Sequence, residues 1–163
     1  MKLRVIAFYI PALYFLCGCH SNQEQFDKIF GIYYEKYPNI HDPMVDENQL
    51  PASPFQQYEA GNYANAISGF DSLLTIQPNQ KFASFYLGLS YFETGEYTKA
   101  VSPLQNAIDS KSNLLVAPAL FYSALAHLKL NKKEEALSQF NEIKKKHDYY
   151  YPRSREIMAL LQE

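Results

Sequence analysis

The residues of this sequence with the clearest capacity for chemistry are its four histidines and its adjacent acidic pairs. No two histidines stand four residues apart, and no cysteine and histidine group has the spacing of a zinc site. His127 lies on a predicted packing face, where a core histidine is far commoner than a metal ligand. Glu134 and Glu135 stand at a predicted helix start, where the helix dipole favours negative charge. The sequence therefore predicts no catalytic residue, no metal site and no cofactor.

The two cysteines lie at the end of a predicted targeting segment. Met1–Arg4 is a short basic start, and Val5–Leu16 is a nearly continuous apolar run. An apolar run of roughly 7–15 residues after a basic start is typical of a signal peptide, whereas a membrane-spanning helix needs about 20 residues. Residues 1–18 are therefore predicted to be a signal peptide.

The end of this run resembles the lipobox of bacterial lipoproteins, in which leucine and a small residue precede the lipidated cysteine. The matching residues are Leu16, Cys17, Gly18 and Cys19. The resemblance implies cleavage before Cys19, which would carry the lipid and anchor the protein to a membrane. The alternative is an ordinary signal peptide with incidental cysteines. His20 stands where an aspartate often signals inner-membrane retention in lipoproteins, so the expected location is the cell envelope, with the outer membrane favoured.

Composition narrows the choice of partners. The chain has 163 residues, which suits one domain with its own core. Its formal net charge of −2 disfavours nucleic acid as a partner, because nucleic-acid binders usually carry a basic patch. The 14 tyrosines and 11 phenylalanines predict large aromatic contact areas, either in a core or at an interface.

A repeated unit is the strongest pattern in the sequence. Residues 61–67 align without a gap with residues 95–101, which lie 34 positions later. A third copy at residues 131–137 follows 36 positions after the second. Each copy opens where one helix must end and an antiparallel helix begin, and glycine and asparagine adopt the left-handed conformation that closes such a turn. The opening residues are Gly61, Gly95 and Asn131.

This pattern resembles the tetratricopeptide repeat family, whose 34-residue unit carries L-G-x-x-Y in its first helix and A-x-x-x-F in its second. The second unit matches both motifs, with Leu87, Gly88 and Tyr91 followed by Ala100 and Leu104. The second motif recurs as Ala66 with Phe70 and as Ala136 with Phe140. The resemblance implies an all-α, TPR-like solenoid of about three antiparallel helix hairpins.

The repeats also divide the chain into segments. The three units are residues 53–80, 81–114 and 117–148. Residues 149–163 are predicted to form a C-terminal capping helix, because a solenoid must cover its last repeat. Within residues 19–52, apolar residues at helical spacing from Phe26 to Tyr37 predict one helix, and the prolines that follow predict a linker.

A second apolar stripe runs along the first helix of each unit. In the resembled family these positions line a concave surface that commonly receives a peptide or a helix, so the stripe is predicted to be a groove for a protein or peptide partner. In one alternative, the chain's own segment around Phe26–Tyr37 covers the stripe. In another, the N-terminal helix of a neighbouring copy fills it and builds a homo-oligomer. The predicted groove residues are Phe55, Tyr58, Phe82, Phe85, Leu89, Phe92, Phe121, Leu125 and Leu128.

The sequence thus predicts a non-catalytic protein-interaction scaffold that is lipid-anchored in the bacterial cell envelope. One alternative is an accessory enzyme of envelope or glycan metabolism, which would need convergent acidic residues in a cleft. The other is a structural lipoprotein that assembles with copies of itself.

Overall fold

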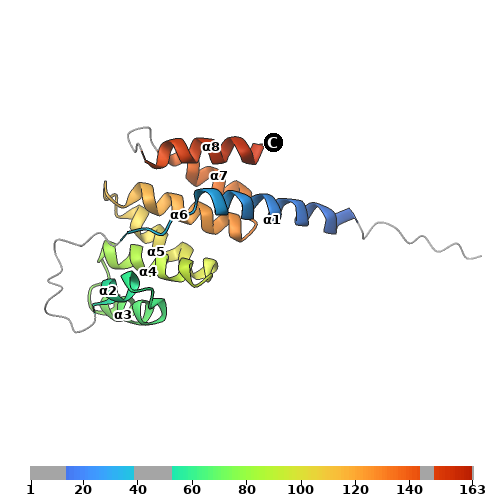
Figure 1. Cartoon of the computed structure of the whole chain (residues 1–163). Helices are drawn as coiled ribbons and strands as arrows, with labels where there is room; N and C mark the ends of the chain where they lie inside the picture. Colours follow the sequence, from blue (N-terminus) through green and yellow to red (C-terminus); the bar gives the residue numbers. More distant parts are fainter. Residues whose placement is uncertain (1–13, 39–52, 144–148, 163) are drawn as a thin grey trace, which may run out of the picture.

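The computed structural model describes residues 14–38, 53–143 and 149–162, with side chains described from Asn22 onward. Within these residues the protein is built from eight α-helices and contains no strand, which confirms the predicted all-α fold (Figure 1). None of the described helices combines the length and the apolar character that crossing a membrane requires.

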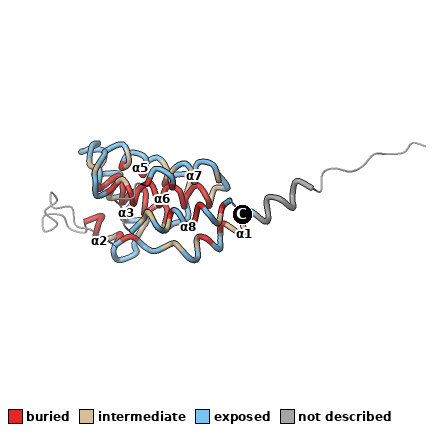
Figure 2. Tube along the Cα trace, turned by 90° about the horizontal axis from the view of Figure 1, so that it is seen from above, coloured by how far each residue is buried: buried red, intermediate tan, exposed pale blue. Residues whose placement is uncertain are grey.

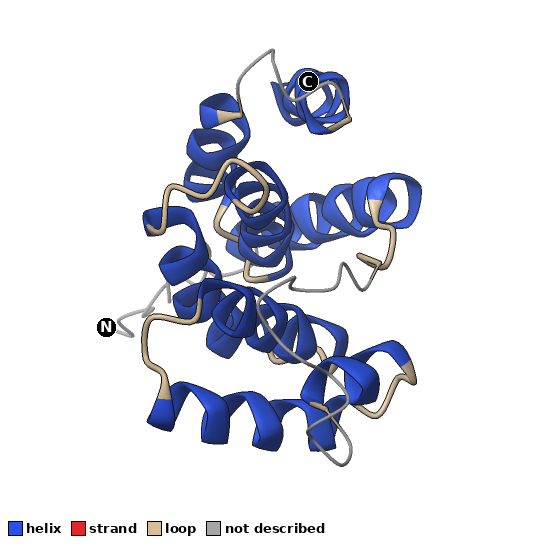
Figure 3. Cartoon of the chain, turned by 90° about the vertical axis from the view of Figure 1, so that its left-hand side faces the viewer, coloured by secondary structure: helices blue, strands red, loops and turns tan. Residues whose placement is uncertain are grey.

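Six of the helices form three consecutive hairpins. The hairpins are α2 (Pro54–Glu59) with α3 (Tyr63–Ile76), α4 (Lys81–Glu93) with α5 (Tyr97–Asp109), and α6 (Val116–Lys129) with α7 (Lys133–Glu142). Each helix packs against the next one along the chain, so the hairpins stack one above another (Figure 3). The last helix, α8 (Tyr150–Gln162), packs against α7 and α6. The first helix, α1 (Tyr14–Tyr33), lies against α6.

The turn inside each hairpin is closed by a left-handed residue, as the repeat predicts. Gly61, Gly95 and Asn131 have φ angles of +78°, +77° and +58°. Around Gly95, the amide of Glu96 donates to the Tyr91 carbonyl at 2.8 Å and the Gly95 amide donates to the Phe92 carbonyl at 3.0 Å. This pair of bonds is a Schellman motif, and the same pair recurs at the other two turns. A further left-handed residue, Lys111 with φ +53°, follows α5 and was not predicted.

A glycine allows the helices of the second hairpin to approach closely. A Cβ atom on Gly88 would lie 2.6 Å from Cγ and 3.1 Å from the backbone nitrogen of Leu104. Any side chain at position 88 would therefore push α4 away from α5. The two repeat motifs thus meet at this contact, since Gly88 belongs to the first and Leu104 to the second.

The first helices of the second and third hairpins, α4 and α6, form the centre of the molecule. Every residue from 82 to 90 in α4 and from 117 to 128 in α6 is buried. Helices that are apolar on all sides belong inside a protein. By contrast, α3, α5 and α7 bury only a narrow stripe of alanine, leucine and phenylalanine. Figure 2 shows α5 and α7 exposed along their outer sides, with the buried residues gathered beside them.

Candidate functional site

The predicted groove is covered in this structure. All nine predicted groove residues are buried, and none is more than 5% exposed. The cover over part of this surface is the chain's own N-terminal segment, in which Phe26, Ile29 and Tyr37 are also buried. We call the surface of α2, α4 and α6 that faces this segment the inner face.

The covering segment has a helical part and a non-helical part. Helix α1 ends at Tyr33, and the chain continues without helix to Pro38, so the helix ends before Tyr37, where the apolar spacing predicted its end. A proline disfavours helical geometry in the residue before it, which accounts for Tyr37 but not for an end as early as Tyr33. We call residues 34–38 the docked segment.

Three tyrosine hydroxyls, one from the first helix of each hairpin, hold the main chain of the docked segment. Each hydroxyl donates a hydrogen bond to a backbone carbonyl of this segment. The bonds join Tyr58 to Tyr37 at 3.0 Å, Tyr86 to Pro38 at 2.9 Å, and Tyr122 to Glu35. These carbonyls lie outside any helix, so the tyrosines satisfy groups that secondary structure leaves unpaired. These three hydrogen bonds therefore do not depend on the side chains of the bound segment.

The side chain of Tyr37 sits in an aromatic cage. Its ring meets the rings of Phe85, Tyr86 and Tyr122 edge to face, with centroids 4.9, 6.1 and 5.9 Å away. Edge-to-face pairs of this kind contribute roughly 0.5–1.5 kcal/mol each beyond simple burial. Burial raises the pKa of the Tyr37 hydroxyl to about 12. The cage therefore selects an aromatic side chain in its neutral form.

Tyr34 anchors the beginning of the docked segment. Its ring stacks against Phe30 and Phe92, with centroids 4.7 and 5.7 Å away. Its hydroxyl donates to both carboxylate oxygens of Glu93, at 2.6 and 2.7 Å. Burial, reinforced by the Glu93 carboxylate, raises the pKa of Tyr34 far above its ordinary value.

The charged residues of the docked segment also have partners. The ammonium of Lys36 lies 3.3 Å from the carbonyl oxygens of Tyr58 and Glu59, at the C-terminal end of α2. This end carries the negative pole of the helix, which favours a cation. The same ammonium lies 5.1 Å from the ring centroid of Tyr58 and 5.3 Å from that of Tyr63. On the other side, the Tyr149 hydroxyl donates to the carboxylate of Glu35.

Helix α1 makes its polar contacts with α6 and α8. Asp27 forms an ion pair with Lys129 at 2.7 Å, and this hydrogen-bonded partner lowers the pKa of the Asp27 carboxyl. The Lys129 ammonium also lies 4.4 Å from the ring centroid of Phe30. The Gln25 amide donates to the Leu160 carbonyl at 2.7 Å, and the Tyr33 hydroxyl donates to Glu156 at 3.1 Å.

Only part of the predicted stripe faces the N-terminal segment. Tyr58, Phe85 and Phe92 contact this segment directly. Phe55 instead packs on Phe70 of its own hairpin, and Phe121 packs on Phe140 of α7 and Tyr150 of α8. The other four predicted residues belong to the same buried core: Phe82, Leu89, Leu125 and Leu128.

Sequence reasoning missed Tyr86 and Tyr122, which contribute both a hydroxyl and a ring to the site. They are 36 residues apart, the same spacing that separates Gly95 from Asn131, so they occupy one position in two successive units. This shared position was the signal that could have found them. It was hidden because the position 34 residues before Tyr86 is Ala52, which precedes the first unit. The first unit supplies its hydroxyl from a different position, Tyr58.

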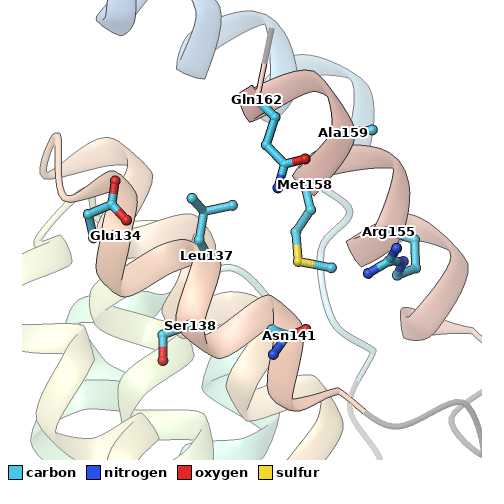
Figure 4. Close-up of a pocket in the computed structure, with 8 residues that line it drawn as sticks. All are labelled: Glu134, Leu137, Ser138, Asn141, Arg155, Met158, Ala159 and Gln162. Atoms are coloured by element: carbon cyan, nitrogen blue, oxygen red, sulfur yellow. The ribbon is translucent and has the colours of Figure 1, made fainter.

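Two cavities border the docked segment or the C-terminal helices. One, of about 350 Å³, lies beside the docked segment, and its lining is Glu35, Lys36, Tyr37, Pro38, Tyr122, Tyr149 and Tyr150. The other, of about 450 Å³, lies between α7 and α8, with Leu137 and Met158 among the side chains that border it (Figure 4). In the described part of the chain, no group of three histidine, cysteine or acidic residues is placed to hold a metal.

His127 is a core residue, as expected from its position. It is 8% exposed, and its Nδ1 atom lies 2.9 Å from Oε1 of Gln139. The amide of Gln139 in turn donates to the Ser123 hydroxyl at 2.9 Å. The predicted lipid-attachment residue, Cys19, is part of α1, and the structure describes its backbone but not its side chain.

Antiparallel helix hairpins with identical turns define this chain as a tetratricopeptide-type repeat protein. Residues 59–143, just over half of the chain, match the model of the family described as anaphase-promoting complex, cyclosome, subunit 3. The chain belongs to this TPR-type repeat family. Such repeats commonly mediate protein–protein interaction and are typically non-enzymatic. No match was found among curated proteins.

Proposed function

We propose that this protein is a non-catalytic interaction scaffold of the bacterial cell envelope whose inner face binds a segment of a partner protein. The observation that carries the proposal is the set of three tyrosine hydroxyls from three successive hairpins that hold backbone carbonyls. Carbonyls are present in every peptide, so this surface suits a segment supplied by another protein as well as the docked segment.

The docked segment must leave the inner face before a partner segment can bind there. A segment tethered within the same chain competes at an effective concentration on the order of millimolar. A partner's apparent affinity is therefore its intrinsic affinity multiplied by the fraction of molecules in which the docked segment is not bound. Weakening the docked segment without changing the inner face should then increase partner binding.

This expectation can be tested by crosslinking and pull-down in cells. Tyr37→Ala removes the side chain that fills the aromatic cage and leaves every residue of the inner face unchanged. Ile32→Ala is the matched control, because Ile32 lies at the end of α1, just before the docked segment, and is 69% exposed. We expect a specific envelope partner to be recovered in greater yield with Tyr37→Ala than with Ile32→Ala or the unaltered protein. Absence of a specific partner with all three proteins would contradict the proposal.

The envelope location rests on the lipid proposed for Cys19, with the outer membrane favoured. We expect cells to incorporate a labelled fatty acid into the protein and into Cys17→Ala, but not into Cys19→Ala. The two cysteines flank Gly18 in the same segment, so they form a matched pair. Labelling of the Cys19→Ala protein, or equal loss in both variants, would argue against attachment at Cys19. Membrane fractionation of the labelled protein would then test the outer-membrane location.

A further inference from the structure

The structure points to the chemistry of the segment that the inner face receives. We propose that the partner presents a non-helical stretch with the order tyrosine, acidic residue, basic residue, tyrosine, and that residues 34–38 are a built-in competitor for it. This inference rests on the proposed scaffold function, because it names the partner chemistry of the same face.

Each side chain in this order has a separate receiving group on the hairpins or at the turn before α8. The first tyrosine position places its hydroxyl against Glu93 and its ring against Phe92. The acidic position meets the hydroxyl of Tyr149, and the second tyrosine position enters the cage built on Phe85.

The basic position has the most distinctive surroundings. The Lys36 ammonium reaches the carbonyl end of α2 and two aromatic rings, a combination that a carboxylate could not replace. Charge order along the segment is therefore specified, with the acid towards α8 and the base towards α2. A segment with these two charges exchanged would place an acid against carbonyl oxygens.

The docked segment also leaves part of its site unfilled. The cavity of about 350 Å³ lies between the segment and the tyrosines of α6 and of the start of α8 with the turn before it, beside the acidic position. Three of its lining residues are Tyr122, Tyr149 and Tyr150, so the space is bordered by aromatic rings and hydroxyls. A partner segment with a further group at this point would gain contacts that the chain's own segment does not make.

The direct test is binding of a fluorescent synthetic peptide with the sequence of residues 30–38, FGIYYEKYP, measured by anisotropy with the full chain. The receiving proteins are the unaltered chain, Tyr37→Ala and the Ile32→Ala control. We expect the peptide to bind Tyr37→Ala at least about tenfold more tightly than either of the others, because the competitor has lost its aromatic anchor. Circular dichroism establishes that each variant is folded.

Two further changes test whether the charge order of the peptide and the tyrosine hydroxyls determine the affinity. A peptide in which the glutamate and lysine exchange places should bind Tyr37→Ala roughly tenfold more weakly. Adding Tyr86→Phe and Tyr122→Phe to Tyr37→Ala removes two hydroxyl donors and keeps both rings. The affinity for the original peptide should fall by about tenfold or more. If Tyr37→Ala does not fold, Lys36→Ala is used instead, because it weakens binding of the docked segment by a change at an exposed residue.

The outcomes separate this inference from the proposed function. Equal peptide binding to Tyr37→Ala and Ile32→Ala, or equal binding of the charge-exchanged peptide, would overturn the inference. If Tyr37→Ala still recovered an envelope partner in cells, the scaffold function would stand and only the segment chemistry would be wrong. A concentration-dependent dimer that the peptide dissociates would instead assign the face to a second copy of this chain, and would also overturn the inference.

Discussion

At the scale of single residues, some side chains of the inner face stabilise the fold and others bind the docked segment. Phe85 belongs to both, since it is fully buried and also borders the cage around Tyr37. The hydroxyls of Tyr86 and Tyr122 serve the docked segment. Substitutions that remove only hydroxyl groups are therefore better probes of binding than substitutions that remove whole rings.

Phe85→Asp should unfold the protein rather than create a binding defect. The change loses a buried ring, at about 3–5 kcal/mol, and places a carboxylate in the core without a partner. Ile76→Asp is the control, because Ile76 is 78% exposed, and we expect it to change stability by no more than about 0.5 kcal/mol. Thermal unfolding followed by circular dichroism measures both. A folded Phe85→Asp protein with unchanged melting temperature would show that this position is not core.

Ser53→Ala should stabilise the protein, contrary to the usual rule for the residue that precedes a helix. Replacing a capping serine by alanine normally costs about 1 kcal/mol. Ser53 precedes α2, but its side chain makes no capping bond. Its hydroxyl is buried and has no hydrogen-bond partner among the described residues. Removing an unpaired buried hydroxyl should gain about 1 kcal/mol. Urea unfolding would measure the change, and a loss of stability would mean that the hydroxyl is satisfied.

At the scale of elements, the repeat register could be predicted and the N-terminal segment only in part. The left-handed turns and the close helix contact at Gly88 require particular residue types. These residue types recur at a fixed spacing in the sequence, so they could be predicted. The end of α1 at Tyr33 depends on carbonyls that tyrosines from three other helices satisfy. Such long-range competition leaves no periodic signal, so apolar spacing alone extends the predicted helix to Tyr37.

The same long-range packing decides what covers the predicted groove. Spacing along a single helix shows that a face is apolar but not what lies against it. Phe121 is covered by α7 and α8, whereas Phe92 is covered by α1 and the docked segment. Both coverings depend on elements beyond the helix that carries the residue, so the pattern within that helix could not distinguish them.

Two glycines in helices should respond in opposite directions to alanine. Gly88→Ala would place Cβ 2.6 Å from Leu104 Cγ, so α4 and α5 must separate, and we expect a loss of about 1–3 kcal/mol. Gly31 in α1 is exposed, and a Cβ atom added there would meet no atom within 4 Å, so alanine should gain up to about 1 kcal/mol from helix propensity. Urea unfolding of both variants measures the difference. Stabilisation by Gly88→Ala would contradict the close contact between the helices.

At the scale of the whole molecule, the N-terminal segment links the proposed membrane anchor to the inner face. Phe26, the first buried residue described, lies seven positions after Cys19. At 1.5 Å per residue in a helix, the proposed lipid would therefore lie about 10 Å along α1 from the first packed residue. A partner that displaces the docked segment would also change how this anchor is connected to the hairpins.

Alkaline pH should release this segment and then unfold the stack. Burial raises the pKa of Tyr37 to about 12, and it also raises the pKa values of Tyr58 and Tyr122. A tyrosine whose pKa is higher in the folded protein contributes stability that is complete below its unfolded pKa of about 10. That contribution is lost as the pH rises through the folded pKa, which for Tyr37 gives a window of about pH 10 to 12.

The measurement is a titration in which tyrosinate absorbance and circular dichroism are followed together. The buried tyrosines Tyr37, Tyr58 and Tyr122 should ionise above pH 10, together with the loss of structure. Tyr37→Phe keeps the ring in its cage and removes the ionisable group, so the first structural transition should move to higher pH. If every tyrosine ionised near pH 10 while the helices persisted, the tyrosines of the inner face would not be buried in solution, and the docked segment would not be bound there.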